Sequence, residues 1–270
     1  MKKVVLVTGA SSGIGKETAK LLVQKGYTVY GASRRVEKMA DLKAEGVNLL
    51  EMDVTDEASM VAGVNKILQN ESRIDILINN AGYGSFGALE DVPMSEAKYQ
   101  FEVNIFGLAR LTQLVLPSMR KQHSGRIINV SSIGGSLGEP HGSWYHATKY
   151  AVEGLSDCLR MEVKQFGIDV VVIKPGAILT EWNTIAREKL LEVSGDTDYK
   201  VLATKHAKLM ATADKSASLP IVVAKTIVRS VVVRRPKTRY ATGGGAKIIL
   251  FVRRILSDRM FDRLVLSLLK

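Results

Sequence analysis

The chain has 270 residues, of which 46% are hydrophobic, and it carries a formal net charge of +11 and a single cysteine. This size and composition suffice for one large core, and no repeat, low-complexity segment or linker divides the chain, so we expect a single domain over residues 1–270. The lone cysteine, Cys158, excludes an internal disulfide and is typical of a reducing compartment, and we expect it to be a small buried apolar residue. No run of about 18 apolar residues is present, and the first apolar stretch is too short for a signal peptide. We therefore expect a cytoplasmic protein without a membrane span.

The first elements of the chain have the order strand, glycine turn, helix. Residues 3–8 are apolar and largely β-branched, which is typical of a buried parallel strand. A glycine-rich turn and an amphipathic helix follow, an order that aims free backbone N–H groups at a pyrophosphate. A glycine turn alone is as compatible with a plain tight loop, but its place at the first strand–helix junction favours a dinucleotide site. The residues expected at that site are Gly9, Ser11, Ser12, Gly13, Ile14 and Gly15.

The end of the second strand-like run, residues 27–32, indicates which nucleotide is bound. An acidic residue near this point binds the ribose 2′-hydroxyl in NAD-specific sites, but here Ser33 is followed by Arg34 and Arg35. A guanidinium matches a phosphate dianion, which a carboxylate would repel. We therefore predict NADP(H), with Ser33 and Arg34 at the 2′-phosphate. For Arg35, a solvated position at the start of the next helix is an equal alternative.

Strand-like runs alternate with helical stretches along the whole chain. This alternation predicts an α/β fold, a doubly wound Rossmann-type domain whose parallel sheet is flanked by helices on both faces. The runs lie at about 3–8, 27–32, 47–51, 74–79, 126–131, 168–174 and 237–241.

Ser132, Tyr145 and Lys149 form a candidate catalytic group. Tyr145 and Lys149 are four residues apart, so they share one face of a helix. A tyrosine has an ordinary pKa of about 10, and a neighbouring ammonium lowers the pKa of a phenol toward the working range. Ser132 offers a hydroxyl that can hold a substrate oxygen against the phenol. A tyrosine packed under a solvated lysine is the alternative, because this spacing is common in helices.

Together with the glycine turn, these residues make the chain similar to the short-chain dehydrogenase/reductase family over roughly residues 3–185. The resemblance implies that Asp53 and Val54 contact the adenine, that residues 80–82 close the fourth strand against the nucleotide, and that residues 175–180 grip the nicotinamide carboxamide. No basic residue precedes Gly13, where many NADP-preferring members carry one, so Arg34 bears more of the 2′-phosphate. The nucleotide contacts implied beyond the glycine turn are Asp53, Val54, Asn80, Ala81, Gly82, Tyr145, Lys149, Pro175, Gly176, Ile178 and Thr180.

The resemblance also implies an activity, reversible hydride transfer between a nicotinamide and a substrate carbonyl or alcohol. Tyr145 would act as general acid in reduction and as general base in oxidation, and Lys149 would lower its pKa and bind the nicotinamide ribose. Ser132 would orient the substrate oxygen, and Asn104 would hold a proton-relay water. His146 lies about 100° around the helix from Tyr145, so we expect it to be a packing or surface residue. No metal is expected.

Residues 181–219 lie where this family places a substrate lid. The segment is rich in Leu, Met and Ala, which favours a bulky apolar carbonyl or alcohol as substrate. The stretch from Trp144 to Leu159 and the basic tail resemble the branch that contains hydroxysteroid and retinol dehydrogenases. The family also implies a homodimer or homotetramer, joined through helices at about 96–120 and 143–166.

The positive charge is concentrated at the end of the chain. Residues 229–270 carry eleven Lys and Arg against two Asp. The basic amphipathic segment 246–270 fits either a helix pair packed on the core or on a partner subunit, or a peripheral contact with an anionic membrane. Nucleic-acid binding is not expected, because the basic residues form no known module and aromatic residues are few.

Two functions other than an oxidoreductase stay open from the sequence. One is a regulatory protein that binds the nucleotide without turnover, although such a protein has no need of Tyr145 and Lys149 together. The other is a lipid-binding protein of the membrane surface that uses the basic tail.

Overall fold

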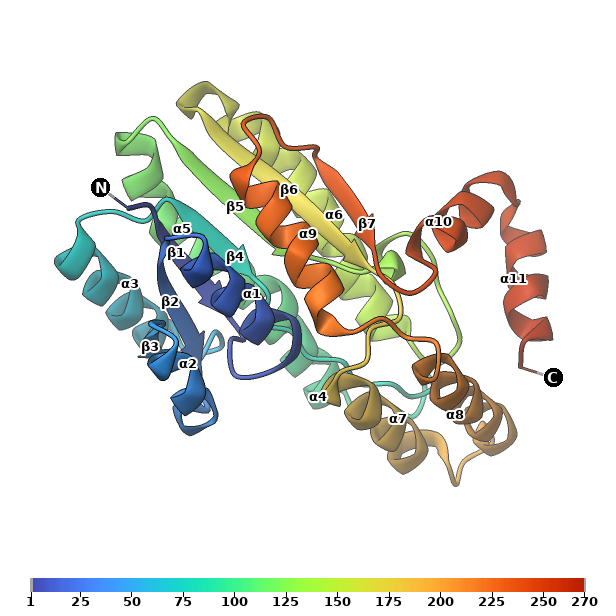
Figure 1. Cartoon of the computed structure of the whole chain (residues 1–270). Coiled ribbons are helices and arrows are strands. Elements are labelled where there is room, and N and C mark those ends of the chain that lie inside the picture. Colours follow the sequence, from blue (N-terminus) through green and yellow to red (C-terminus); the bar gives the residue numbers. More distant parts are fainter. Residues whose placement is uncertain (1, 270) are drawn as a thin grey trace.

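The computed structural model describes residues 2–269, which form one α/β domain around a seven-stranded sheet (Figure 1). All strand pairs are parallel, and the strand order is β3-β2-β1-β4-β5-β6-β7. Each strand begins and ends within two residues of the strand-like run seen in the sequence, so the predicted doubly wound fold is confirmed. The strands are β1 (Val4–Thr8), β2 (Thr28–Ser33), β3 (Asn48–Glu51), β4 (Ile76–Asn79), β5 (Gly125–Val130), β6 (Ile168–Pro175) and β7 (Arg239–Thr242).

Helices cover both faces of the sheet. The α-helices are α1 (Gly13–Gln24), α2 (Ala40–Ala44), α3 (Glu57–Glu71), α4 (Met94–Phe101), α5 (Gly107–Lys121), α6 (Ser143–Val163), α7 (Glu181–Ser194), α8 (Lys200–Asp214), α9 (Pro220–Val232), α10 (Ala246–Ile255) and α11 (Asp258–Ser267). The short helical turns are η1 (Val36–Met39), η2 (Glu102–Phe106), η3 (Ile133–Gly135) and η4 (Lys164–Phe166).

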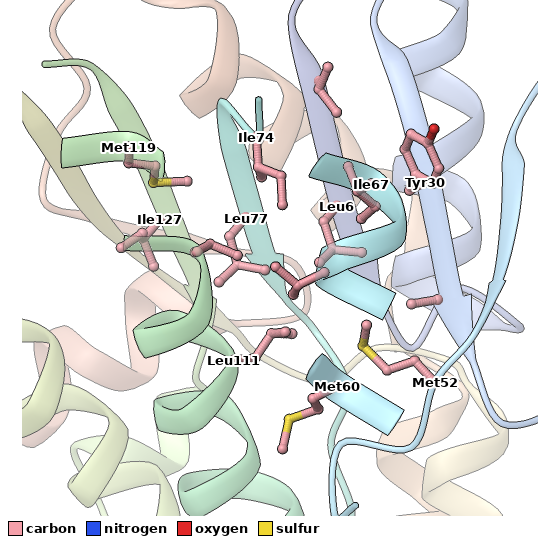
Figure 2. Packing of buried hydrophobic residues seen from close by; sticks show 14 of the residues in the cluster. Leu6, Tyr30, Met52, Met60, Ile67, Ile74, Leu77, Leu111, Met119 and Ile127 are labelled. Atoms are coloured by element: carbon pink, nitrogen blue, oxygen red, sulfur yellow. The ribbon is translucent and has the colours of Figure 1, made fainter. Parts of the chain in front are cut away.

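The side chains of each strand alternate between two cores. Leu6 of β1 faces α3 and α5, where it packs with Ile67 and Leu111 (Figure 2). Val5 and Val7 point to the opposite face, which α1, α2 and α9 cover. Because both faces of the sheet are buried, the strands are continuous apolar runs in the sequence. Their positions could therefore be predicted within two residues.

The strand order reverses between β1 and β4. In a doubly wound sheet, the loops that leave the carboxyl ends of these two strands turn to opposite faces and leave a crevice between them. The glycine turn after β1 and the loop after β4 form the walls of this crevice. The fold thus positions a ligand site at this edge of the sheet.

Two helical pairs lie outside the layered body. The pair α7 and α8 comes from the expected lid segment and lies beyond the carboxyl ends of the strands (Figure 1). The pair α10 and α11 comes from segment 246–270 and extends away from the sheet (Figure 1). Within the described part of the second pair, only Ala246, Phe261 and Leu269 are buried, so most of its surface is not covered by this chain.

Cys158 is exposed on α6, so the expectation that it is a small buried apolar residue is wrong. Among the helices that the structure describes, none combines the length and the apolar character needed to cross a bilayer.

Candidate active site

A cavity of about 700 Å³ opens at the carboxyl ends of the strands. Its lining joins the glycine turn, the end of β2, the loop after β4, the start of α6 and the lid helices. Of the site residues expected from the sequence, only Gly15 and Asn104 do not line it. Segments far apart in the sequence therefore meet in one site.

The glycine turn has the backbone that only glycine adopts easily. Gly9 and Gly13 have φ values of +66° and +52°. Gly15 lies behind the turn, where a Cβ atom would come within 2.3 Å of the carbonyl oxygen of Gly9. Gly15 thus allows the helix to pack closely against the turn rather than contacting a ligand. Ser12 precedes α1 without capping it through its side chain, so the first N–H groups of the helix stay free for an anion.

Thr8 and Asn80 hold the glycine turn against the loop after β4. The Asn80 side chain donates to the carbonyl oxygens of Thr8 and Gly9 at 2.9 and 3.3 Å. In return, the Thr8 hydroxyl accepts from the backbone N–H groups of Asn80 and Ala81, both at 3.0 Å. These bonds fix the crevice before any ligand binds. Thr8 was not among the expected site residues.

Two arginines flank the end of β2. The Arg34 guanidinium donates to the Tyr99 hydroxyl at 2.8 Å and lies 3.8 Å from the Asp53 carboxylate. The Arg35 guanidinium donates to the hydroxyl of Ser11, in the glycine turn, at 3.3 Å. Both arginines line the cavity, so Arg35 is as well placed for a phosphate as Arg34.

Asp53 also stabilises its own turn. One carboxylate oxygen accepts from the backbone N–H and the hydroxyl of Thr55, at 2.9 and 2.8 Å. On the other side of the crevice, Thr180 lies close to Gly13, since a Cβ atom at Gly13 would be 3.3 Å from its methyl group. Segment 175–180 therefore forms a wall of the cavity beside the glycine turn, and its contact with a nicotinamide stays a prediction.

Ser132, Tyr145 and Lys149 meet in the same cavity. The Lys149 ammonium lies 5.7 Å from the centre of the Tyr145 ring and donates to the carbonyl oxygen of Val130 at 3.2 Å. Ser132 caps the turn η3, where its hydroxyl accepts from the N–H of Gly134 at 3.0 Å. The predicted group of three is thus brought together by β5, η3 and α6.

The ionisation of this group differs from the expectation. Burial raises the pKa of Tyr145 to about 12; the Ser132 hydroxyl opposes this rise and the Glu139 carboxylate adds to it. Burial lowers the pKa of Lys149 to about 8, against a smaller opposing effect of Glu153. The prediction that Lys149 lowers the pKa of Tyr145 below its ordinary value is therefore wrong for the protein alone, because exclusion of water from the buried phenol raises its pKa.

Asn104 lies in the π-helical turn η2, behind the catalytic group. Its side-chain oxygen accepts from the N–H of Tyr83 at 2.8 Å, and its amide nitrogen donates to the Tyr83 carbonyl at 2.7 Å and to the Thr148 hydroxyl at 3.1 Å. Asn104 therefore joins the loop after β4 to α6. A relay role for it stays a prediction.

An aromatic wall faces Tyr145 in the substrate half of the cavity. The Phe86 and Trp182 rings lie 5.5 and 5.0 Å from the Tyr145 ring, between ring centres. Leu209 and Met210 of α8 continue this wall. Phe86 was not expected from the sequence, because it lies in a loop with no motif of its own.

Glu139 and three histidines form a polar cluster at the same wall. His146 is buried as packing would require, but it also lines the cavity together with Glu139 and His206. His141 stands behind His206, with their Nδ1 atoms 3.1 Å apart. Sequence reasoning missed Glu139 and His206, although Glu139 lies between Ser132 and Tyr145 and could have been noticed there.

The residues present fit a nicotinamide dinucleotide. The cradle of positive-φ glycines, the free start of α1 and the two arginines suit a pyrophosphate and a further phosphate. Tyr145 and Lys149 line the same cavity and would hold the nicotinamide end of such a molecule. When bound, the nicotinamide dinucleotide would supply the hydride chemistry.

Comparison with known proteins agrees with this reading of the site. The family model described as short chain dehydrogenase matches residues 3–190. The chain is 37% identical to a 3-ketodihydrosphingosine reductase of Bacteroides thetaiotaomicron, over 89% of this chain and 88% of the relative. It is 31% identical to an NADPH-dependent 3-dehydrocapnine reductase of Ornithobacterium rhinotracheale, over 99% and 98%. A short-chain dehydrogenase structure from Streptomyces avermitilis superposes with a TM-score of 0.82 at 33% identity, covering 94% of this chain and 92% of that one.

The chain therefore belongs to the short-chain dehydrogenase/reductase family. It is an oxidoreductase that acts on a carbonyl or alcohol group with a nicotinamide nucleotide.

Proposed function

We propose that this protein is an NADP(H)-dependent reductase of a bulky, apolar ketone or aldehyde. It would work as an alcohol dehydrogenase when the ratio of cofactors favours oxidation. The observation that carries the proposal is that Tyr145 faces the same cavity as the glycine turn, with an apolar lid over it.

The ionisation of Tyr145 suits reduction. A phenol with a pKa near 12 stays protonated at neutral pH, yet it is far more acidic than the alcohol that forms from a carbonyl. Tyr145 therefore keeps its proton until negative charge develops on the substrate oxygen, and donates it then. Lys149 stabilises the phenolate left behind, and Ser132 holds the substrate oxygen in line.

The preference for NADP(H) rests on Arg34 and Arg35, which connect β2 to η1, and on the neutral Ser33 at the end of β2. We expect Arg34→Ala and Arg35→Ala each to weaken NADPH about ten- to hundred-fold and NADH much less, because a charge-assisted bond to phosphate is lost. Dissociation constants of both nucleotides, from fluorescence titration, would measure this. Arg110→Ala, outside the cavity on α5, serves as the control. Equal losses for both nucleotides would contradict the assignment.

The lid supports an apolar substrate with a long chain. The cavity beneath it is walled by Phe86, Trp182 and Met210, and the relatives named above reduce 3-ketodihydrosphingosine and 3-dehydrocapnine. Steroid-like and retinoid-like substrates, suggested by the narrower resemblance of the sequence, belong to the same apolar class. NADPH oxidation against long-chain, steroid, retinoid and quinone carbonyls tests the proposal. A chain that binds NADPH but reduces none of them would fit the non-catalytic alternative.

We also propose that α10 and α11 contact an anionic membrane surface without entering it deeply. Ile248, Phe251 and Ile255 recur at helical spacing on α10, and each is at least 62% exposed. Lys247 and Arg254 flank them, an arrangement that suits acidic lipids. Ile249 of the same helix lines the cavity, so the helix lies at the entrance for an apolar substrate.

Liposome co-sedimentation tests this contact. Phe251→Glu with Ile255→Glu should abolish binding to vesicles that contain phosphatidylserine, whereas Val201→Glu, an exposed apolar position on α8, should not. Unchanged binding of the double variant would remove the support for it.

A homodimer or homotetramer is the remaining proposal from the family. Phe106 on η2 and Tyr150 and Met161 on α6 are exposed, and a partner subunit would cover them. Light scattering after gel filtration would give the mass in solution.

A further inference from the structure

Glu139 is a carboxylate in the substrate half of the cavity for which carbonyl reduction has no use. It lies between η3 and α6, six residues before Tyr145, and it lines the cavity. The N–H of Gly142 donates to its backbone oxygen at 3.4 Å, and Pro140 follows it directly. The position of this acidic group is therefore set by the turn that leads into the catalytic helix.

The Glu139 carboxylate lacks hydrogen-bond donors from the described part of the protein. Among the described residues, no group donates a hydrogen bond to its oxygens. The nearest polar atoms are Nε2 of His146, 3.6 Å from Oε1, and Nε2 of His206, 3.8 Å from Oε2. Both distances exceed that of a hydrogen bond. The side chain is 37% exposed, so the carboxylate is open to the cavity, where a cationic ligand could reach it.

The neighbouring imidazoles do not meet this need while they are neutral. Nδ1 of His146 lies 2.9 Å from the carbonyl oxygen of Gly134, which only accepts, so the ring proton sits on Nδ1. Nε2 of His146 then turns a lone pair toward Glu139, and this buried atom has no hydrogen-bond partner. Nδ1 of His206 faces Nδ1 of His141. When Nδ1 of His206 carries the ring proton and donates to His141, Nε2 of the neutral His206 ring is an acceptor as well.

The charges of the cluster leave room for a cation. Burial lowers the pKa of His206, and burial followed by the nearby His206 lowers the pKa of His141 to about 4, so both are neutral at pH 7. Burial alone would raise the pKa of Glu139, but the neighbouring histidines, His146 foremost, hold it below its ordinary value, so the carboxylate is ionised at pH 7. Burial alone would lower the pKa of His146, and Glu139 raises it more, which shows how strongly this site attracts a positive charge.

We infer that Glu139, His146 and His206 form a subsite for a protonated amine of the substrate. An ammonium carries three N–H donors and no acceptor, so it can satisfy the carboxylate and two imidazole nitrogens at once. A hydroxyl has one donor and would leave two of these acceptors unmet. Within the described residues, no group of three or more His, Cys, Asp and Glu side chains is arranged to hold a metal ion.

The subsite lies beside the reacting carbonyl. The His146 ring is 5.7 Å from the Tyr145 ring, and the His206 ring is 6.2 Å from the Phe86 ring, which itself packs on Tyr145. A carbonyl held by the Tyr145 hydroxyl would therefore lie next to this subsite, which suits an amine on a carbon close to that carbonyl. The substrate class is therefore a long-chain amino ketone, an inference that rests on the proposed reduction at Tyr145.

Three substrates of equal chain length test this inference: a ketone with an adjacent amino group, the same ketone with a hydroxyl in its place, and the unsubstituted ketone. We expect the protein to prefer the amino ketone through a lower KM. Glu139→Gln should raise that KM about ten- to hundred-fold, the range of a bond to a charged group, and leave the other two within about two-fold. Glu188→Gln, which removes the same charge from the exposed face of α7, should change none of them.

A binding measurement separates this inference from the proposed reduction. Calorimetric titration with a long-chain primary amine and with the matching alcohol needs no turnover. The inference holds if the amine binds more tightly and Glu139→Gln removes the difference. It is overturned if amine and alcohol bind alike, or if Glu139→Gln leaves the amine unaffected, since the proton of His146 would then already neutralise the carboxylate. Failure to reduce any ketone, with amine binding intact, would instead count against the proposed reduction.

Discussion

At the scale of single residues, burial makes the charged forms of Tyr145 and Lys149 costly. Lys149 is only 7% exposed, and Tyr145 is enclosed by Phe86 and Trp182. Burial disfavours the ammonium of the one and the phenolate of the other. The sequence identified both residues through their spacing, but spacing says nothing about how much water the fold removes. The expected pKa of Tyr145 was therefore wrong, whereas its catalytic role stays a prediction.

Tyr145→Phe should reduce turnover about a thousand-fold, the range expected for loss of a proton-transfer group, because the substitution removes the proton-donating hydroxyl. NADPH binding should stay nearly unchanged. Steady-state rates together with a nucleotide titration would check both. Turnover near that of the unmodified protein would refute the role given to Tyr145.

Lys149→Met should stabilise the protein while it abolishes activity. A pKa lowered from 10.5 to about 8 means that burying the ammonium costs ~3 kcal/mol relative to the neutral amine. The substitution removes this cost but also the bond to Val130, so we expect a gain of about 1–3 kcal/mol at pH 7 in the free energy of unfolding. Urea denaturation would measure the gain. A loss of stability would show that Lys149 is held more favourably than its pKa indicates.

The same group gives a pH dependence with a definite sign. Between pH 8 and about 10.5 the unfolded chain binds more protons at Lys149 than the folded chain does, so the contribution of this residue to stability rises with pH. Unfolding at pH 7.5 and at pH 9.5 should therefore show a smaller advantage of Lys149→Met at the higher pH. An advantage that grows with pH would contradict the lowered pKa.

At the scale of helices and strands, local sequence patterns predicted the strands and the glycine turn but not the residues around the substrate. The strands are apolar on both faces, and the glycine turn is contiguous, so both can be read from short windows of sequence. The wall around the substrate could not be read in this way, because Phe86, Glu139 and His206 come from three segments that meet only in the fold. The π-helical turn at Asn104 likewise leaves no local sequence signal.

Contact between the loop after β4 and the lid depends on Gly84. A Cβ atom at this position would lie 2.1 Å from the Trp182 ring. Gly84→Ala should therefore displace the indole from Tyr145, lower stability by about 1–3 kcal/mol, and raise KM for bulky ketones more than for small ones. Gly154→Ala is a matched control, since nothing lies within 4 Å of its added atom. Thermal unfolding and steady-state kinetics would check this; equal behaviour of the two variants would show that the indole can shift at no cost.

At the scale of the whole molecule, the residues proposed to hold the nucleotide and those proposed to hold the substrate line one cavity. The layered body provides the nucleotide end, and the helices outside it, α7 and α8, cover the substrate end. The C-terminal pair α10 and α11 was expected mainly to pack on the core or on a partner, and in this chain most of its surface is exposed. Sequence could show that these helices are amphipathic but could not show whether their own chain covers them.

One contact couples the two ends of the cavity. The Arg35 guanidinium lies 3.8 Å from the carboxylate of Glu181, the first residue of lid helix α7. A 2′-phosphate on Arg35 would compete with Glu181 for the same cation. Thr180, which precedes Glu181 and lies beside Gly13, would also contact the bound nucleotide. Arrival of the nucleotide would thus release the lid at its hinge, and we expect compulsory-order kinetics with the nucleotide first on and last off. Product-inhibition patterns would show this order, and a random order would mean that the ion pair does not restrain the lid.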